Sequence, residues 1–160
     1  MTSILLVAER DEQGEINQAT LQAVAAASGL SDPQITVAIA GEAPTSVASL
    51  PVDSVVTLSD IEISDNGIFE QVTVDIAALV SSINPDVVLF SKSDFGSVVG
   101  ARLAFRSDSA FASDCIEISN AGDAMMVTRP VYGGSALAEF EISSTPTVVT
   151  LRAGAYEPTT

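Results

Sequence analysis

The sequence predicts an α/β fold: a parallel sheet with helices on both faces, extended at one edge by antiparallel strands near the C-terminus. Two patterns carry this prediction. In the first two thirds of the chain, short continuous apolar runs, typical of strands buried on both faces, alternate with segments of helical periodicity. Beyond that region the strands follow one another closely, as in an antiparallel meander. With 160 residues, the chain is expected to form a single domain over residues 1–160.

The parallel part is expected to contain four strands and three helices. Continuous apolar runs predict the strands at residues 3–8, 35–40, 54–58 and 86–91. Asn17 is a suitable N-cap for the first helix, and Gly29 is a suitable residue just beyond its end. Apolar residues at helical spacing from Phe69 to Ile83 predict the second helix, and the third is expected at about residues 98–106.

The C-terminal part is expected to consist of closely spaced strands. They are predicted at residues 112–118, 124–131, 136–142 and 147–151, the last returning as part of the meander. Gly133 and Gly134 favour a bulge, bend or turn, because glycine accepts backbone angles closed to other residues. Glu139 and Glu141 alternate with apolar residues, so their strand is expected to be half exposed.

The charge balance is strongly negative. Six Lys and Arg residues stand against 21 Asp and Glu, which gives a net charge of −15. Such a field repels nucleic acid and anionic membranes, because both are bound mainly through positive charge. Solubility is the favoured explanation of this charge, and an acidic docking face for a basic partner is the alternative. No apolar run approaches the ~20 residues of a membrane span, so we expect a cytoplasmic bacterial protein without membrane insertion.

The chain offers little catalytic chemistry. It has no histidine, and its single cysteine, Cys115, lies in an apolar run that favours a buried structural role over a nucleophilic one. No pair of carboxylates stands in a motif that specifies a general acid and base, and no nucleophile elbow is present. Asp60, Glu62 and Asp65 lack the spacing of a calcium loop. We therefore predict no catalytic residue, no metal site and no enzymatic activity.

A small-ligand crevice is the binding site that this fold class suggests, because open α/β sheets bind ligands beyond the carboxyl ends of their strands. The loops after the predicted strands place Glu9, Gly41, Ser91 and Asp94 there. Residues 93–97 form a polar, glycine-containing turn before a helix. That geometry either holds an anion on free backbone N–H groups or simply caps the helix. The cap is the favoured interpretation, since Asp94 would repel a phosphate.

Several segments resemble, in order and spacing, the N-terminal domain of the electron transfer flavoprotein alpha subunit. They are Ile4–Glu9, Ile16–Leu21, Phe95-Gly96, Arg102–Ala104, Asp108, Ser113-Asp114, Arg129–Ala136 and Val149–Arg152. Each short motif is of moderate specificity, whereas their combined order over nearly the whole chain is a strong signal. The segment Ser93–Gly96 departs from the threonine-containing, lysine-followed version usual in the family, which argues against a ligand role there.

The resemblance implies a Rossmann-like fold of the adenine nucleotide alpha-hydrolase type. It also implies a heterodimer with a beta subunit that carries electrons from acyl-CoA and related dehydrogenases, in fatty acid oxidation, toward a membrane quinone reductase. In the family, FAD is bound mainly by a second, C-terminal domain of the alpha subunit, with help from beta. That domain has no counterpart in this sequence. The segment is therefore expected to be an excised or truncated domain that binds no FAD itself.

The resemblance also implies where partners meet this domain. Arg129 and Arg152 are expected to contact the beta subunit or the FAD domain, together with Tyr132, Gly133 and Gly134 of the glycine turn. The alternative for both arginines is an ion pair with local carboxylates at the strand ends. Two other functions stay open: a stand-alone module that binds AMP or ATP at the strand ends and, less favoured, a small hydrolase or transferase.

Overall fold

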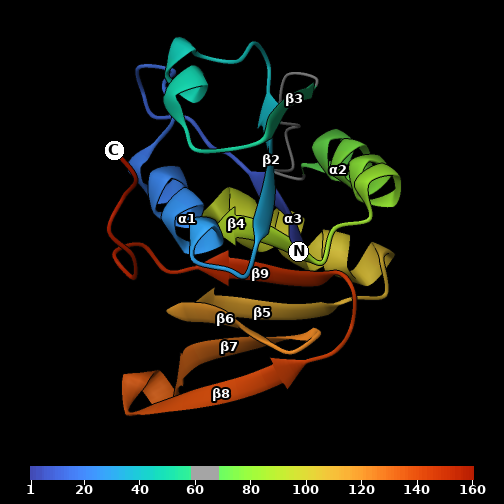
Figure 1. Cartoon of the computed structure of the whole chain (residues 1–160), viewed down its shortest axis with the longest axis vertical. Helices are drawn as coiled ribbons and strands as arrows, with labels where there is room; N and C mark the ends of the chain where they lie inside the picture. The colour runs from blue at the N-terminus through green and yellow to red at the C-terminus, as the bar shows by residue number, and fades with distance from the viewer. Residues whose placement is uncertain (59–68) are drawn as a thin grey trace.

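The computed structural model describes residues 1–58 and 69–160 of the chain (Figure 1). Six strands in these residues form one sheet in the order β3-β2-β1-β4-β9-β5, and every adjacent pair runs parallel. The strands are β1 (Thr2–Val7), β2 (Pro33–Ala40), β3 (Ser54–Leu58), β4 (Val87–Ser91), β5 (Ala110–Cys115) and β9 (Thr147–Leu151). Asp60, Glu62 and Asp65, where the sequence predicts no calcium site, lie outside the described residues.

Helices cover both faces of this sheet, so the predicted fold class is confirmed (Figure 1). They are α1 (Gln18–Ser28), α2 (Glu70–Ile83) and α3 (Asp94–Arg106), and the short 3₁₀ helix η1 (Thr45–Ser49) follows β2. Alternate residues of β1 belong to two apolar layers. Ile4 and Leu6 pack in the layer under α1, whereas Leu5 and Val7 pack in the layer under α2 and α3. The continuous apolar run of β1 is explained by burial on both faces.

Side-chain caps begin two of the helices. The side chain of Asn17 accepts a 2.8 Å hydrogen bond from the backbone N–H three residues later, and Gly29 ends α1, as predicted. Ser93 caps α3 in the same way, because its hydroxyl accepts the backbone N–H of Gly96 at 2.9 Å. α3 therefore begins at Asp94, a full turn before the predicted start near residue 98.

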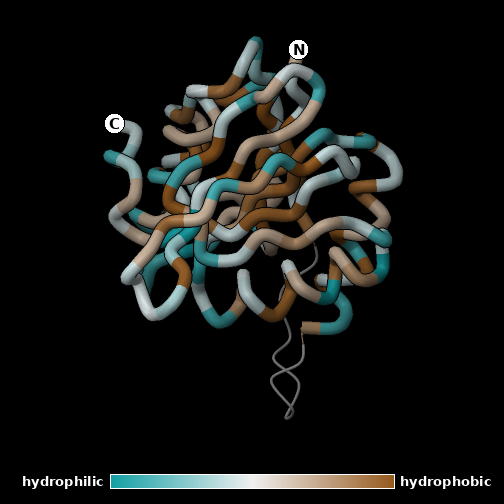
Figure 2. Tube along the Cα trace, turned by 90° about the horizontal axis from the view of Figure 1, so that it is seen from below, coloured by the Kyte–Doolittle hydropathy of each residue, from teal (hydrophilic) through white to brown (hydrophobic). Residues whose placement is uncertain are grey.

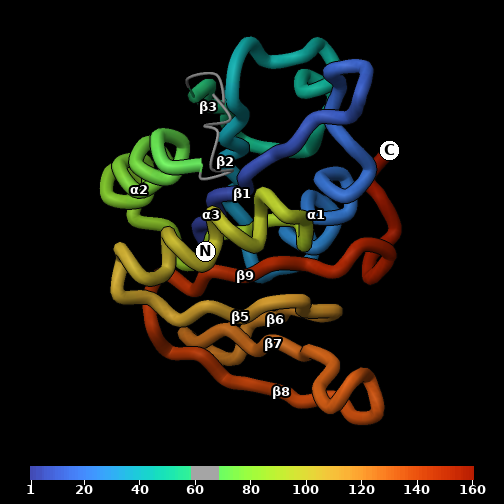
Figure 3. The backbone as a smooth tube through the Cα atoms, turned by 180° about the vertical axis from the view of Figure 1, so that it is seen from behind, coloured from blue at the N-terminus to red at the C-terminus, as the bar shows by residue number. Residues whose placement is uncertain are grey.

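The antiparallel strands form a sheet of their own beside the parallel one. They are β6 (Glu117–Ala121), β7 (Ala124–Val131) and β8 (Ala136–Ile142), with the 3₁₀ turn η2 (Tyr132–Gly134) between the last two. β7 packs against β5, so this sheet lies beyond the β5 edge (Figure 3). Antiparallel strands at one edge of the molecule are thus found where the sequence predicts them, but as a separate hydrogen-bonded ladder.

Two expectations in the C-terminal part are wrong. Residues 112–118 do not form one strand: the register between β5 and β9 is irregular between Ala112 and Cys115, where Asp114 has a φ of +60°, and β5 ends at Cys115. The chain leaves the parallel sheet at Cys115 and enters the antiparallel sheet at Glu117. Residues 147–151 do form a strand, but this strand, β9, lies between β4 and β5. All five of its residues are buried, as a central parallel strand requires.

The core is made of the apolar strands and the helix faces that pack on them. In Figure 2 the brown, apolar stretches run mainly through the centre of the molecule. Cys115 is fully buried there as a free thiol, and its Sγ lies 3.6 Å from the carbonyl oxygen of Ala112. Burial raises the pKa of Cys115 to about 11, so the thiol stays protonated near neutral pH. The predicted buried structural cysteine is confirmed.

Candidate functional site

The carboxyl ends of β1 and β4 meet where the strand order of the parallel sheet reverses. This is the switch point at which open α/β sheets bind ligands. Glu9 follows β1 and Ser93 follows β4, and the hydroxyl of Ser93 donates to the carboxylate of Glu9, with 2.9 Å to each oxygen. The structure thus places one predicted crevice residue, Glu9, against the start of α3.

This contact puts negative charge at the N-terminus of α3. The Ser93 hydroxyl that donates to Glu9 is the same group that caps the helix by accepting the N–H of Gly96. Asp94 adds a second carboxylate in the first helical turn. The capped helix start is therefore confirmed for residues 93–97. Because a carboxylate already lies where the helix N-terminus would attract an anion, this turn is unfavourable for a phosphate.

The other predicted crevice residues do not join Glu9 around one group. The N–H of Gly41 donates to the carbonyl of Leu58 in β3 at 2.9 Å. Ser91 is only 3 % exposed, and its hydroxyl has no hydrogen-bond partner among the described residues. Asp94 is exposed to solvent. The four residues share an end of the sheet, as predicted, without forming a common binding site.

Arg152, directly after β9, forms an ion pair with Asp114. Its Nε donates to Asp114 Oδ1 at 3.0 Å, and its Nη2 donates to the other carboxylate oxygen. This hydrogen-bonded guanidinium is the main reason that the pKa of Asp114 lies below its usual value. The local ion pair considered for Arg152 is therefore present. Its side chain is still 49 % exposed, and a partner contact of Arg152 stays a prediction.

Two further positive groups, Lys92 and Arg129, lie close enough to Asp114 to lower its pKa. Lys92 directly follows β4, and Arg129 lies on β7. The Nε of Arg129 is buried and has no hydrogen-bond partner in the described part of the chain. We call Lys92, Asp114, Arg129 and Arg152 the basic cluster, and it holds three of the six Lys and Arg residues of the sequence.

Sequence reasoning missed Lys92 and Asp114 as members of this cluster. A signal was available, because Lys92 and Arg152 each directly follow a predicted strand. Placing residues 147–151 in the antiparallel meander hid their proximity, since only a parallel β9 beside β4 brings the two strand ends together.

The predicted glycine turn joins β7 to β8. Tyr132, Gly133 and Gly134 all have positive φ values, of 53°, 65° and 90°, and Tyr132 is 86 % exposed. β8 also exposes Leu137 (62 %) and Phe140 (45 %), and in the described sheets β7 is its only strand partner. We call Tyr132, Leu137 and Phe140 the hairpin surface. Leu137 and Phe140 stand three residues apart on β8 and so point to opposite faces of this strand, which means that exposed apolar side chains flank its open edge on both faces.

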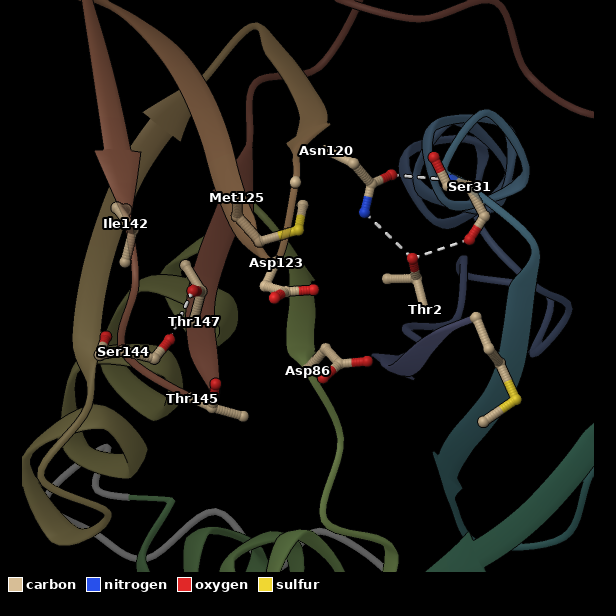
Figure 4. Close-up of a pocket in the computed structure, with 12 residues that line it drawn as sticks. Thr2, Ser31, Asp86, Asn120, Asp123, Met125, Ile142, Ser144, Thr145 and Thr147 are labelled. Carbon is tan, nitrogen blue, oxygen red and sulfur yellow. Dashed lines mark hydrogen bonds between the residues drawn. The ribbon is translucent and has the colours of Figure 1, made fainter.

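A polar cavity of about 380 Å³ lies at the opposite, amino end of the strands (Figure 4). Asn120 of β6 reaches across it: its Nδ2 donates to Thr2 Oγ1 at 3.0 Å, and its Oδ1 accepts the N–H of Ser31 at 2.7 Å. Thr2 Oγ1 donates in turn to the carbonyl of Ser31 at 2.8 Å. Because these groups satisfy one another and join the antiparallel sheet to β1, we assign them a structural role.

The described residues contain neither a metal-binding cluster nor a membrane-spanning helix. Within residues 1–58 and 69–160, no group of three or more His, Cys, Asp or Glu side chains is arranged to hold a metal ion. In the same residues, no helix combines the length and the apolar character needed to cross a membrane.

Comparison with known proteins decides the family. The family model described as "Electron transfer flavoprotein domain" matches residues 4–160. The chain belongs to the electron transfer flavoprotein domain family. The family resemblance drawn from the sequence motifs is thereby confirmed.

Several curated relatives are named electron transfer flavoprotein subunit alpha. The protein of Bacillus subtilis (strain 168) is 30 % identical over 143 residues, which cover 84 % of this chain and 42 % of the relative. The protein of Methylophilus methylotrophus is 29 % identical over 167 residues, covering 99 % of this chain and 51 % of the relative. That of Mycobacterium leprae (strain TN) is 26 % identical over 160 residues, covering 98 % and 49 %. The chain spans about half the length of these curated relatives.

The structure shows where the C-terminal segments that resemble the electron transfer flavoprotein family lie. Arg129–Ala136 runs from β7 through η2 to the first residue of β8, and Val149–Arg152 ends β9. The first segment contributes to both the basic cluster and the hairpin surface, and the second contributes Arg152. The family motifs thus coincide with the two surface features at this end of the molecule.

Proposed function

We propose that this chain acts as the N-terminal domain of an electron transfer flavoprotein alpha-type subunit in the bacterial cytoplasm. In this role it scaffolds a heterodimer with the beta subunit. The complex carries electrons from acyl-CoA and related dehydrogenases to a quinone reductase through FAD, and this domain holds no FAD itself. Family membership and the alpha-subunit names of the relatives support the proposal.

The observation that carries the subunit contact is the hairpin surface. An open strand edge with exposed apolar side chains promotes aggregation in a solitary domain, and natural proteins usually cover such an edge. Leu137 and Phe140 lie on β8 itself, and Tyr132 lies in the turn that leads into it. Exposed aromatic and aliphatic side chains of this kind commonly form the centre of a protein interface. We therefore place the beta subunit on β8 and η2.

Binding of the purified beta subunit tests this assignment. The double change Leu137→Ser and Phe140→Ser removes two exposed apolar side chains, and we expect the dissociation constant, measured by calorimetry, to rise by about tenfold or more. Phe105→Ser is the matched control, because Phe105 is 90 % exposed but lies on α3, away from the hairpin. Equal affinity of the double variant and the unchanged chain would remove β8 from the proposed interface.

Arg129 and Arg152 are tested in the same assay. If these residues contact the beta subunit, as the family resemblance implies, alanine at either position weakens association. Arg102→Ala on α3 removes the same charge at a remote place and serves as the control. Unchanged affinity of both variants would leave Arg152 with its Asp114 ion pair alone.

The alternative function, binding of AMP or ATP at the strand ends, has less support. The start of α3, where a phosphate would be expected, faces the carboxylates of Glu9 and Asp94. Calorimetric titration of the chain with AMP, ATP and FAD separates the two proposals. We expect Ser93→Ala to leave any heat of binding unchanged, whereas micromolar AMP binding that is lost in Ser93→Ala would favour the nucleotide module.

A further inference from the structure

We infer that the basic cluster binds an oxyanion of the phosphate class, held by Lys92, Arg129 and Arg152 at the carboxyl ends of β4, β9 and β5. The site differs from the start of α3, which faces carboxylates, and it adjoins the hairpin surface, because Arg129 lines a hollow together with Phe140. The inference concerns this chain alone and does not rest on the proposed beta-subunit contact.

Backbone hydrogen bonds hold Lys92 and Arg152 at neighbouring strand ends. The N–H of Lys92 donates to the carbonyl of Leu151 at 2.8 Å, which joins the end of β4 to the residue before Arg152. The N–H of Arg152 donates to the carbonyl of Cys115 at 2.9 Å, which joins the end of β9 to the end of β5. The two cationic side chains therefore leave a rigid sheet edge, not mobile loops.

The other two members of the basic cluster, Asp114 and Arg129, are held in place where the chain passes from β5 to the antiparallel sheet. The N–H of Ile116 donates to the carbonyl of Thr128 at 2.8 Å, directly before Arg129. The N–H of Asp114 donates to the buried hydroxyl of Thr150 at 2.9 Å. Asp114 and Arg129 are thus tied to the same end of β9 as Arg152.

The basic cluster is rich in positive side chains, whereas the chain as a whole is strongly negative. Three of the six positive residues of a chain whose net charge is −15 belong to this cluster, and they act on one carboxylate member, Asp114. Like charges held close together repel one another, and a bound anion relieves that repulsion. The carboxyl ends of parallel strands are also where open α/β sheets bind ligands.

Donor groups suited to a phosphate remain available in the cluster. Arg152 uses Nε and Nη2 on Asp114, and its Nη1 has no hydrogen-bond partner in the described residues. The Nε of Arg129 is buried without a partner, and Lys92 is exposed. Guanidinium and ammonium groups together match the several acceptor oxygens of a phosphate. Asp114 serves as the internal counter-ion while no anion is bound.

Titration of the purified chain with inorganic phosphate at constant ionic strength, balanced with potassium chloride, tests the site. Calorimetry and the thermal unfolding midpoint are the two readouts. We expect phosphate to bind and to raise the midpoint, and we expect Lys92→Ala and Arg129→Ala each to weaken binding by about tenfold. Lys92 is exposed, so its variant is expected to fold normally. Arg102→Ala and Arg106→Ala remove the same charge on α3 and should leave the affinity unchanged.

Asp114→Asn gives the discriminating result. Asparagine tolerates the positive φ of this position, and the change frees the guanidinium of Arg152 and removes the competing carboxylate. Phosphate should then bind several-fold more tightly. Absence of phosphate binding, equal weakening by the α3 variants, or no gain in Asp114→Asn would each overturn the inference. Acetate, tested in parallel, should bind more weakly, and equal affinity would overturn the assignment to the phosphate class.

Discussion

The phenolic oxygen of Tyr156 accepts a 2.9 Å hydrogen bond from the backbone N–H of Ile118, which lies on the first strand of the antiparallel sheet. The same C-terminal segment also contacts α1, where the N–H of Gly154 donates to the side chain of Gln22 at 3.0 Å. Tyr156 packs beside the apolar layer under α1. The segment after β9 thus joins both sheets and one helix.

Tyr156→Phe is expected to destabilise the chain. The change leaves the N–H of Ile118 without its partner, which lowers the free energy of unfolding by about 1–3 kcal/mol. Urea denaturation followed by circular dichroism measures the difference. Tyr132→Phe is the control, because the Tyr132 ring is exposed in the η2 turn. Equal stability of the two variants would mean that water replaces the lost hydroxyl at Ile118.

Glu9→Gln is expected to stabilise the chain at neutral pH. Burial raises the pKa of Glu9, and the hydrogen bond from Ser93 opposes this only in part, so the charged form is disfavoured in the folded state. For a carboxyl group with a raised folded pKa, this unfavourable term grows as pH rises above the unfolded value of about 4.3. It is absent well below that value.

The thermal midpoint of Glu9→Gln should therefore exceed that of the unchanged chain at pH 7, and the gap should close toward pH 4. Glutamine keeps an acceptor oxygen for the Ser93 hydroxyl. Glu12→Gln, an exposed position in the same loop, controls for the change in net charge. A gap that widens on acidification would contradict the sign of the pKa shift.

The ion pair of Asp114 with Arg152 stabilises the folded chain, and this contribution depends on pH in the opposite sense to that of Glu9. Its pKa is lowered, mainly by the hydrogen bond from Arg152, so the ion pair contributes fully above the unfolded value of about 3.9 and is lost as pH falls through the folded pKa. Arg152→Ala should therefore reduce stability at pH 7, and the difference should shrink in acid, at a pH below the folded pKa of Asp114. Unfolding by urea at both pH values checks this. A deficit that persists undiminished in acid would point to packing of Arg152 as its cause.

Gly96→Ala is expected to disrupt the contact between α3 and β4. A Cβ atom at this position would lie 1.9 Å from the carbonyl oxygen of Ser91, a backbone atom that cannot turn aside. We expect a loss of about 3 kcal/mol or more in the free energy of unfolding. Gly29→Ala is the matched control, since its Cβ would have a nearest neighbour at 3.5 Å and its φ is −82°. A stable Gly96→Ala protein would show that α3 shifts on the sheet.

The sequence by itself determined the local and layered features of this protein. The continuous apolar run of β1 predicted burial on two faces, because a strand with helices on both sides needs apolar residues at odd and even positions. Asn17 and Gly29 predicted both ends of α1, since caps act over a few residues. The order of the family motifs, from Ile4–Glu9 to Val149–Arg152, was sufficient to predict the family.

Only the tertiary structure decided which strand ends lie side by side. Periodicity reports whether a strand is buried, but an apolar run such as residues 147–151 is equally compatible with a meander and with a central place in a parallel sheet. The positive φ of Asp114, just before residues 112–118 pass from one sheet to the other, accompanies a hydrogen bond to Thr150, far along the chain. Lys92 and Arg152 become neighbours through the pairing of β4 with β9, and the basic cluster follows from that pairing.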